Sequence, residues 1–204
     1  MLSQAEKGGV QNTIQNCVTV LQNDPILADS IRLNLLSERI DIVKPMGWQR
    51  SGPTLTDTDM MYILRRMKKY GLYSEKRVSA AIRIVANENH YHPIRDYLNE
   101  LKWDGTARIS RALHRFLGAA EDELTTEALK IFLLGAIKRV FHPGCKFEMM
   151  LCLVGGQGAG KSSFFRLLAI KDEWFSDDLR RLDDDNVFRK LQGHWIIEMS
   201  EMIA

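Results

Sequence analysis

Residues 148–169, EMMLCLVGGQGAGKSSFFRLLA, decide the fold of this chain. A run of apolar residues leads into a glycine-rich segment, which is followed by a lysine, two serines and a helical pattern. Residues 155–162 fit the P-loop spacing G-x-x-x-x-G-K-[ST]. The apolar run is typical of a strand buried on both faces of a parallel sheet. The order strand–loop–helix therefore predicts an α/β fold, and the alternative is a glycine-rich turn that matches the motif by chance.

The residue types in this loop suit the binding of a nucleotide phosphate. Glycines let backbone N–H groups approach phosphate oxygens without a Cβ clash, and the start of the next helix offers a positive dipole end. Lys161 would reach the β- and γ-phosphates, and the Ser162 hydroxyl would ligate Mg²⁺. We therefore expect ATP and Mg²⁺ as cofactors. The residues expected to bind them are Gly155, Gly156, Gln157, Gly158, Ala159, Gly160, Lys161, Ser162 and Ser163.

An acidic residue is expected to complete this site. A P-loop enzyme needs an acid at the end of a neighbouring strand, to hold Mg²⁺ or to orient the attacking water. The stretch HWIIEMSEM, residues 194–202, predicts a buried strand that carries Glu198 and Glu201. We expect Glu201 to be the catalytic base beside Lys161, with Glu198 as a further metal ligand. In a strand these two glutamates point to opposite faces, so the alternative is that one or both are surface carboxylates.

Two more acids, Asp177 and Asp178, end a predicted strand within EWFSDDL, residues 173–179. We expect them in a solvated turn rather than at the metal.

The chain before the loop has a mainly helical pattern. Helices are predicted over residues 13–24, from a cap at Thr56 to a stop near Gly71, from a cap at Ser74, after Pro93, over residues 108–118 and from about residue 126 to 141. Residues 31–45 predict a short strand or hairpin. The predicted organisation is a helical region at 1–118, a helical connection at 119–147 and the first part of a parallel-sheet P-loop domain at 148–204.

The net charge of +2 is nearly neutral, so nucleic-acid binding would require a local basic patch. Arg65, Arg66, Lys68 and Lys69 form such a patch near a turn between two predicted helices, with Lys76 and Arg77 close in sequence. We expect this patch to contact a DNA backbone. The alternative is a solvated helix end, where cations are favoured.

The three cysteines, Cys17, Cys145 and Cys152, lack metal-binding spacing. They favour a reduced, cytoplasmic protein, with Cys152 buried in its apolar run. The sequence contains no apolar stretch long enough to cross a membrane.

Several segments together resemble the virulence-associated protein E family of phages, prophages and their satellites. These are YHPIRDYLNELKWDGTARI, HPGCKFEMMLCLVGGQGAGKSSFFRLLA, EWFSDDL and LQGHWIIEMSEM, with a looser likeness at residues 11–25 and 55–71. The resemblance implies a P-loop ATPase of the replicative helicase type, related to superfamily 3 and the AAA+ group. It also implies homo-oligomers, partners such as a primase, and Glu201, with Glu198, as the Walker B acid.

The sequence departs from this family where it ends, at Ala204. Family members continue through strands that carry a polar sensor and an arginine finger, so the resemblance implies a truncated domain that hydrolyses ATP slowly. Three functions stay open. They are the ATP-binding portion of a DNA helicase-like replication ATPase, another P-loop kinase or translocase, and a non-catalytic DNA- or partner-binding remnant with a vestigial nucleotide site.

Overall fold

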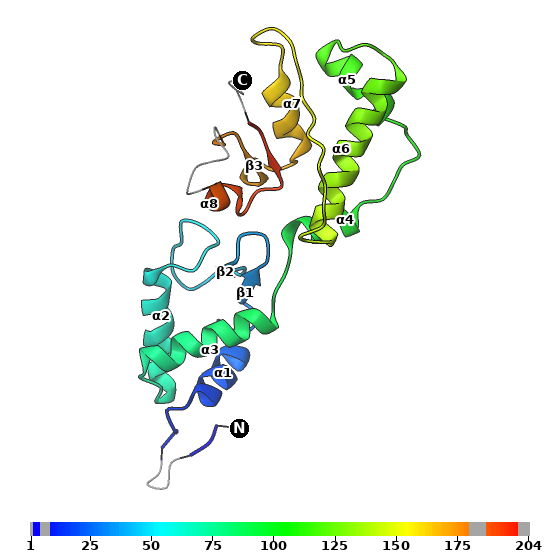
Figure 1. Ribbon diagram of the computed structural model, residues 1–204. Helices are drawn as coiled ribbons and strands as arrows, with labels where there is room; N and C mark the ends of the chain where they lie inside the picture. The colour runs from blue at the N-terminus through cyan, green and yellow to red at the C-terminus, as the bar shows by residue number, and fades with distance from the viewer. Residues whose placement is uncertain (1, 5–8, 180–186, 200–204) are drawn as a thin grey trace. The chain divides into compact units, whose positions relative to one another are not determined.

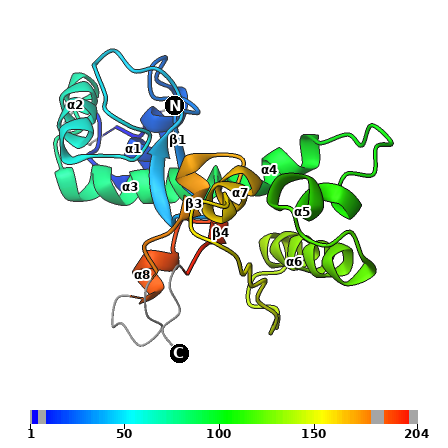
Figure 2. The same ribbon diagram turned by 90° about the horizontal axis from the view of Figure 1, so that it is seen from above.

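The computed structural model of the chain describes residues 2–4, 9–179 and 187–199. It separates the chain into two units, residues 1–93 and 94–204, which Figures 1 and 2 show from two directions. None of the helices in the described ranges is both long and apolar enough to span a membrane.

The first unit consists of helices and one short hairpin. Its elements are α1 (Ile14–Asn23), β1 (Ile31–Asn34), β2 (Arg39–Ile42), α2 (Asp57–Met67), the 3₁₀ turn η1 (Lys68–Tyr70) and α3 (Glu75–Glu88). Local signals set their ends. Thr56 and Asp59 form the predicted capping box of α2, and Ser74 caps α3. Gly71 ends η1 in the left-handed conformation, at φ 78°. The hairpin is antiparallel, with Ile31 opposite Ile42.

Apolar side chains of these elements form one core. Cys17 and Leu21 of α1, Ile63 of α2 and Val78 and Ile82 of α3 are each at most 1% exposed. Buried carboxylates tie the loops to this core, because each accepts several hydrogen bonds. Asp59, for example, accepts from the side chains of Arg50, Trp48 and Thr56. Burial alone would raise the pKa of Asp59, but these bonds outweigh burial and hold it well below its usual range.

The second unit is mixed α/β. Its elements are α4 (Pro93–Glu100), α5 (Ile109–Leu117), α6 (Glu123–Phe141), α7 (Lys161–Leu168), the 3₁₀ turn η2 (Asp172–Trp174), β3 (Phe175–Ser176), α8 (Val187–Leu191) and β4 (Ile196–Ile197). β3 and β4 pair in parallel, with Phe175 opposite Ile196. The α/β class is thus confirmed, and the parallel sheet of the described residues consists of this one pair.

Three helices of this unit share a hydrophobic cluster. Leu113 of α5, Leu129 of α6 and Phe164 of α7 are its buried members. The Trp195 ring, next to β4, donates from Nε1 to the carbonyl oxygen of Ala136 in α6 at 3.2 Å. The helices therefore hold α7 and the strand pair within one unit. The sequence-based limits at residues 118 and 147 stay a prediction.

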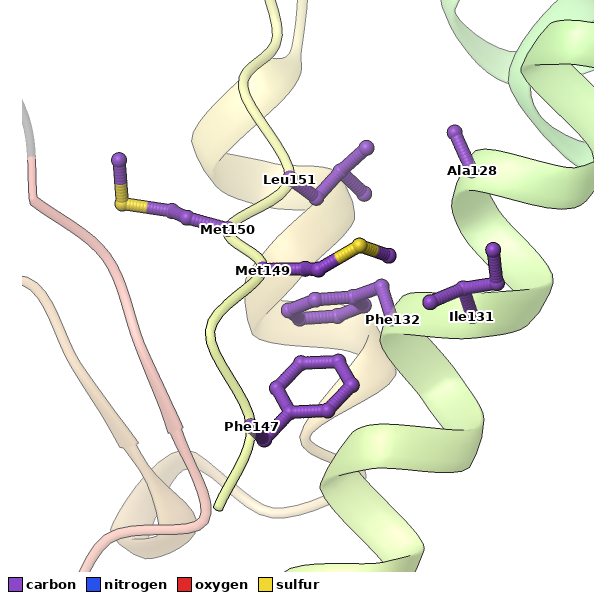
Figure 3. A pocket seen from close by; sticks show the side chains of 7 residues that line it. All are labelled: Ala128, Ile131, Phe132, Phe147, Met149, Met150 and Leu151. Carbon is purple, nitrogen blue, oxygen red and sulfur yellow. The ribbon is translucent and has the colours of Figure 1, made fainter.

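The apolar run before the glycine-rich loop does not form the buried strand that the sequence predicts. Residues 149–154 have no regular secondary structure, Cys152 is exposed, and Met150 and Val154 are 61% and 98% exposed. Figure 3 shows the side chains of Phe147, Met149 and Leu151 on the side of α6, with Met150 directed away. The segment thus alternates like a strand, but within the described ranges no strand pairs with it, and a strand requires a hydrogen-bonded partner.

The side chains directed toward α6 line an apolar pocket of about 290 Å³ (Figure 3). Its α6 wall is formed by Ala128, Ile131 and Phe132. One turn further along α6, the Phe147 ring lies where a Cβ on Gly135 would be, 2.2 Å from the ring's Cζ atom. A side chain at position 135 would therefore force the Phe147 ring to move, and glycine allows the ring to lie against α6.

Candidate phosphate-binding site

The glycine-rich loop connects the extended segment to α7 and bends at two glycines. Gly158 and Gly160 have φ values of 78° and 80°, in the left-handed region that side chains with a Cβ rarely adopt. Gly160 is the N-cap of α7. The backbone N–H groups of Lys161, Ser162 and Ser163 begin this helix, and none of them has a hydrogen-bond partner among the residues that the structure describes. Such N–H groups are suited to receive an anion.

The Lys161 side chain folds back over this loop. Its Nζ atom donates to the carbonyl oxygens of Gly155 and Gly156, at 2.8 Å in each case. The ammonium group is thus held against the loop by two neutral acceptors. A phosphate group carries charged oxygens, which form stronger hydrogen bonds with an ammonium than carbonyl oxygens do.

Glu198 meets the start of α7. Ser162 Oγ donates to Glu198 Oε1 at 2.6 Å, and the Glu198 N–H group donates to the carbonyl oxygen of Ser176 at 2.8 Å, which continues the β3–β4 pairing. The second carboxylate oxygen, Oε2, is buried and has no hydrogen-bond partner in the described part of the chain. A hydroxyl and a carboxylate with one free oxygen are the hard ligands that Mg²⁺ prefers. These two residues therefore fit a magnesium ion.

The other predicted acids have different places. Glu201 lies outside the described residues, so its expected role as the base stays a prediction. Asp177 pairs with Arg166 of α7 at 3.2 Å, and Asp177 and Asp178 are both exposed, as predicted, although residues 177–179 form no regular turn. Within the described ranges no cluster of three or more His, Cys, Asp or Glu side chains is placed to hold a metal.

The carboxyl end of α5 reaches the loop, a neighbour that the sequence did not indicate. A Leu117 methyl group, Cδ2, lies 4.0 Å from the position of a Cβ on Gly160. The rings of Phe116 and Phe164 have centroids 6.4 Å apart. More than 40 residues separate these contacts in the chain, and no motif links them, so only the packing of α5 on α7 brings them together.

The residues of the predicted basic patch in the first unit differ in their contacts and exposure. Arg66 Nε donates to Asp24 Oδ1 at 2.5 Å, and the Asp24 side chain is fully buried. This ion pair ties Arg66 to the folded core, and its part in a DNA-contacting patch stays a prediction. Arg65, Lys68 and Lys69 are exposed.

A comparison with models of protein families matches residues 98–204, just over half of the chain, to the virulence-associated protein E-like domain. A comparison with curated proteins found no match. The matched range contains the glycine-rich loop, α7 and the β3–β4 pair, which are the elements that carry the candidate site. This chain belongs to the virulence-associated protein E-like domain family.

Proposed function

We propose that this chain binds ATP with Mg²⁺ through residues 155–163 and Glu198, as the ATP-binding portion of a replication ATPase. The hydrogen bond between Ser162 and Glu198 carries this proposal, because it joins the loop helix to an acid at the end of a parallel strand. That is the pairing of hydroxyl and acid that P-loop enzymes use. Membership of the virulence-associated protein E-like family further suggests a phage- or prophage-associated protein.

Each group in the site has a distinct part in this proposal. The free N–H groups at the start of α7 bind phosphate oxygens, and Lys161 exchanges its two carbonyl acceptors for oxygens of the β- and γ-phosphates. Ser162 and Glu198 provide oxygen ligands for Mg²⁺, which neutralises phosphate charge when bound. Glu201 is retained as the proposed base that orients the attacking water.

Isothermal titration of the 204-residue chain with Mg·ATP tests the site. Lys161→Ala removes charge-assisted hydrogen bonds worth about 1.5–3 kcal/mol, so we expect about 10- to 150-fold weaker binding. Lys146→Ala is the matched control, since Lys146 is an exposed lysine of the same unit that pairs with Glu148 at 2.8 Å. Equal affinities of the wild-type and Lys161→Ala proteins would show that the assignment is wrong.

The Glu198→Gln variant tests metal binding separately from phosphate binding. Glutamine keeps an acceptor for the Ser162 hydroxyl but removes the negative charge that would face the metal. We expect Mg²⁺ to strengthen ATP binding much less in this variant than in the wild type, while binding without Mg²⁺ is little changed. If Mg²⁺ strengthens ATP binding equally in the wild type and in Glu198→Gln, Glu198 is not a ligand of the metal.

Turnover distinguishes the replication ATPase from the alternatives. Slow ATP hydrolysis that single-stranded DNA stimulates would support the hydrolysis-impaired portion of a helicase-like enzyme, with homo-oligomers and a primase as its proposed partners. Hydrolysis at several turnovers per second by this chain alone would contradict the expected impairment. Hydrolysis that DNA does not affect would favour another P-loop kinase or translocase. Nucleotide binding without hydrolysis would favour a non-catalytic DNA- or partner-binding remnant.

A further inference from the structure

We propose that Phe116, at the end of α5, is the platform on which the base of the bound nucleotide stacks. The inference rests on the proposed function, since it concerns a nucleotide whose phosphates occupy residues 155–162. It adds a specificity-determining residue from outside the loop. It also names the ligand as a nucleotide with a base, in preference to a bare polyphosphate.

The position of Phe116 supports this role. A methyl group of its neighbour Leu117 lies 4.0 Å from where a Cβ on Gly160 would be, and Gly160 is the N-cap of the helix whose N–H groups would receive the phosphates. The Phe116 ring also packs beside Phe164, one turn into α7, at a centroid distance of 6.4 Å and an interplanar angle of 42°. The ring is thus beside the phosphate cradle and on the same helix pair. A base attached through its ribose can extend from the cradle to this ring.

The exposure of Phe116 leaves room for a ligand. Phe116 as a whole residue is 64% exposed, whereas Leu113, one turn earlier, is buried at 5%. The surrounding turn is ordered by local contacts: Gly118 ends α5 at φ 69°, and His114 Nδ1 lies 2.8 Å from the Ala119 carbonyl oxygen. A large apolar ring held in place beside a phosphate site offers a surface for a nucleobase, because every base has a π-face that can stack.

The charges on α5 favour an anionic ligand at the same end of the helix. Arg108 pairs with Asp104 at 2.5 Å, and Arg111 pairs with Glu121 at 3.3 Å. Arg115, by contrast, has no acidic partner among the described residues, and its guanidinium lies 5.6 Å from the centroid of the Phe116 ring. A cation without a counter-ion next to an exposed ring suits a ligand that combines a flat base with negative charge.

The experiment compares Mg·ATP with Mg·tripolyphosphate, which has the phosphates but no base. We expect Phe116→Ala to weaken ATP binding by about 5- to 150-fold, the range measured for one base stacked on an aromatic ring. Tripolyphosphate binding should not change. Phe116→Trp should retain ATP affinity, because it keeps a stacking surface. Phe188→Ala is the control, since Phe188 of α8 is a phenylalanine that is 81% exposed, and it should change neither affinity.

Each other outcome overturns the inference in a recognisable way. If Phe116→Ala binds ATP like the wild type while Lys161→Ala does not, the base lies elsewhere and the phosphate site stands. If Phe116→Ala weakens both ligands equally, Phe116 supports the fold of the loop rather than the base. If neither ligand depends on Lys161, the proposed function fails, and the base platform fails with it.

Discussion

Replacing Arg66 with alanine tests whether this residue belongs to the fold or to a basic surface. Arg66 is 21% exposed at its side chain and donates to Asp24, which is fully buried. Asp24 also accepts from the Tyr70 hydroxyl at 2.7 Å and from the N–H groups of Ile26 and Leu27 at 2.9 and 3.1 Å. Without Arg66, the buried carboxylate would keep these three donors but lose its only ion pair among the described residues.

The size of the loss follows from these contacts. Removing one partner of a fully buried ion pair costs about 3–5 kcal/mol. The loss should be smaller than this, because Asp24 keeps its other donors and Arg66 is partly exposed. It should still exceed about 1.5 kcal/mol, the lower value for a hydrogen bond to a charged group. We therefore expect Arg66→Ala to lower the free energy of unfolding by about 2–3 kcal/mol. Arg65→Ala, at an exposed neighbour whose guanidinium lies 5.4 Å from the Tyr62 ring centroid, should cost less than about 1 kcal/mol.

Urea unfolding followed by circular dichroism measures both variants, and pH provides a second test. Burial raises the pKa of Asp24, but its hydrogen bonds from Arg66, Tyr70 and the backbone outweigh burial and lower it below the usual 3.8. The stabilisation is therefore present at neutral pH and lost as the pH falls through the folded-state pKa. The difference between the wild-type and Arg66→Ala proteins should narrow in acid. Equal losses of unfolding free energy in Arg66→Ala and Arg65→Ala would contradict the assignment of Arg66 to the fold. A difference in unfolding free energy between the wild-type and Arg66→Ala proteins that does not depend on pH would contradict it as well.

Two further predictions concern DNA and packing. Replacing Arg65, Lys68 and Lys69 with glutamate, with Arg66 left intact, should abolish salt-dependent retention of the protein on single- and double-stranded DNA. The chain should stay folded. Unchanged retention would show that this surface does not bind DNA. Gly135→Ala should lower the free energy of unfolding by about 1–3 kcal/mol, because the new Cβ overlaps the Phe147 ring. This loss is expected even though alanine favours a helix over glycine by about 1 kcal/mol. Thermal melts measure this loss, which should shrink in a Phe147→Ala background; a gain in stability would contradict the packing argument.

Features that depend on neighbouring residues can be predicted from the sequence alone. The cap at Thr56 and the glycine that ends α5 at Gly118 were predicted, because capping and left-handed φ values act within one helical turn. The glycine-rich loop and the helix at Lys161 follow from local sequence for the same reason, and two of the loop glycines, Gly158 and Gly160, have positive φ values. α6 begins slightly earlier than predicted, because Asp122 caps it.

Which distant groups meet depends on how the segments pack in the folded chain. Residues 149–154 have the composition of a buried strand, but a strand also needs a partner, which composition does not reveal. Arg66 is joined to Asp24 across 42 residues through a contact that no sequence spacing encodes. Glu198 is expected at the same metal as Ser162, but the parallel pairing of β3 and β4 is what brings it to Ser162 across 36 residues. The place of Phe116 beside Phe164 likewise depends on the packing of α5 on α7, which no motif indicates. Local backbone preferences act over a few residues, whereas pairing and burial are set by segments that are remote in the chain and come together only on folding.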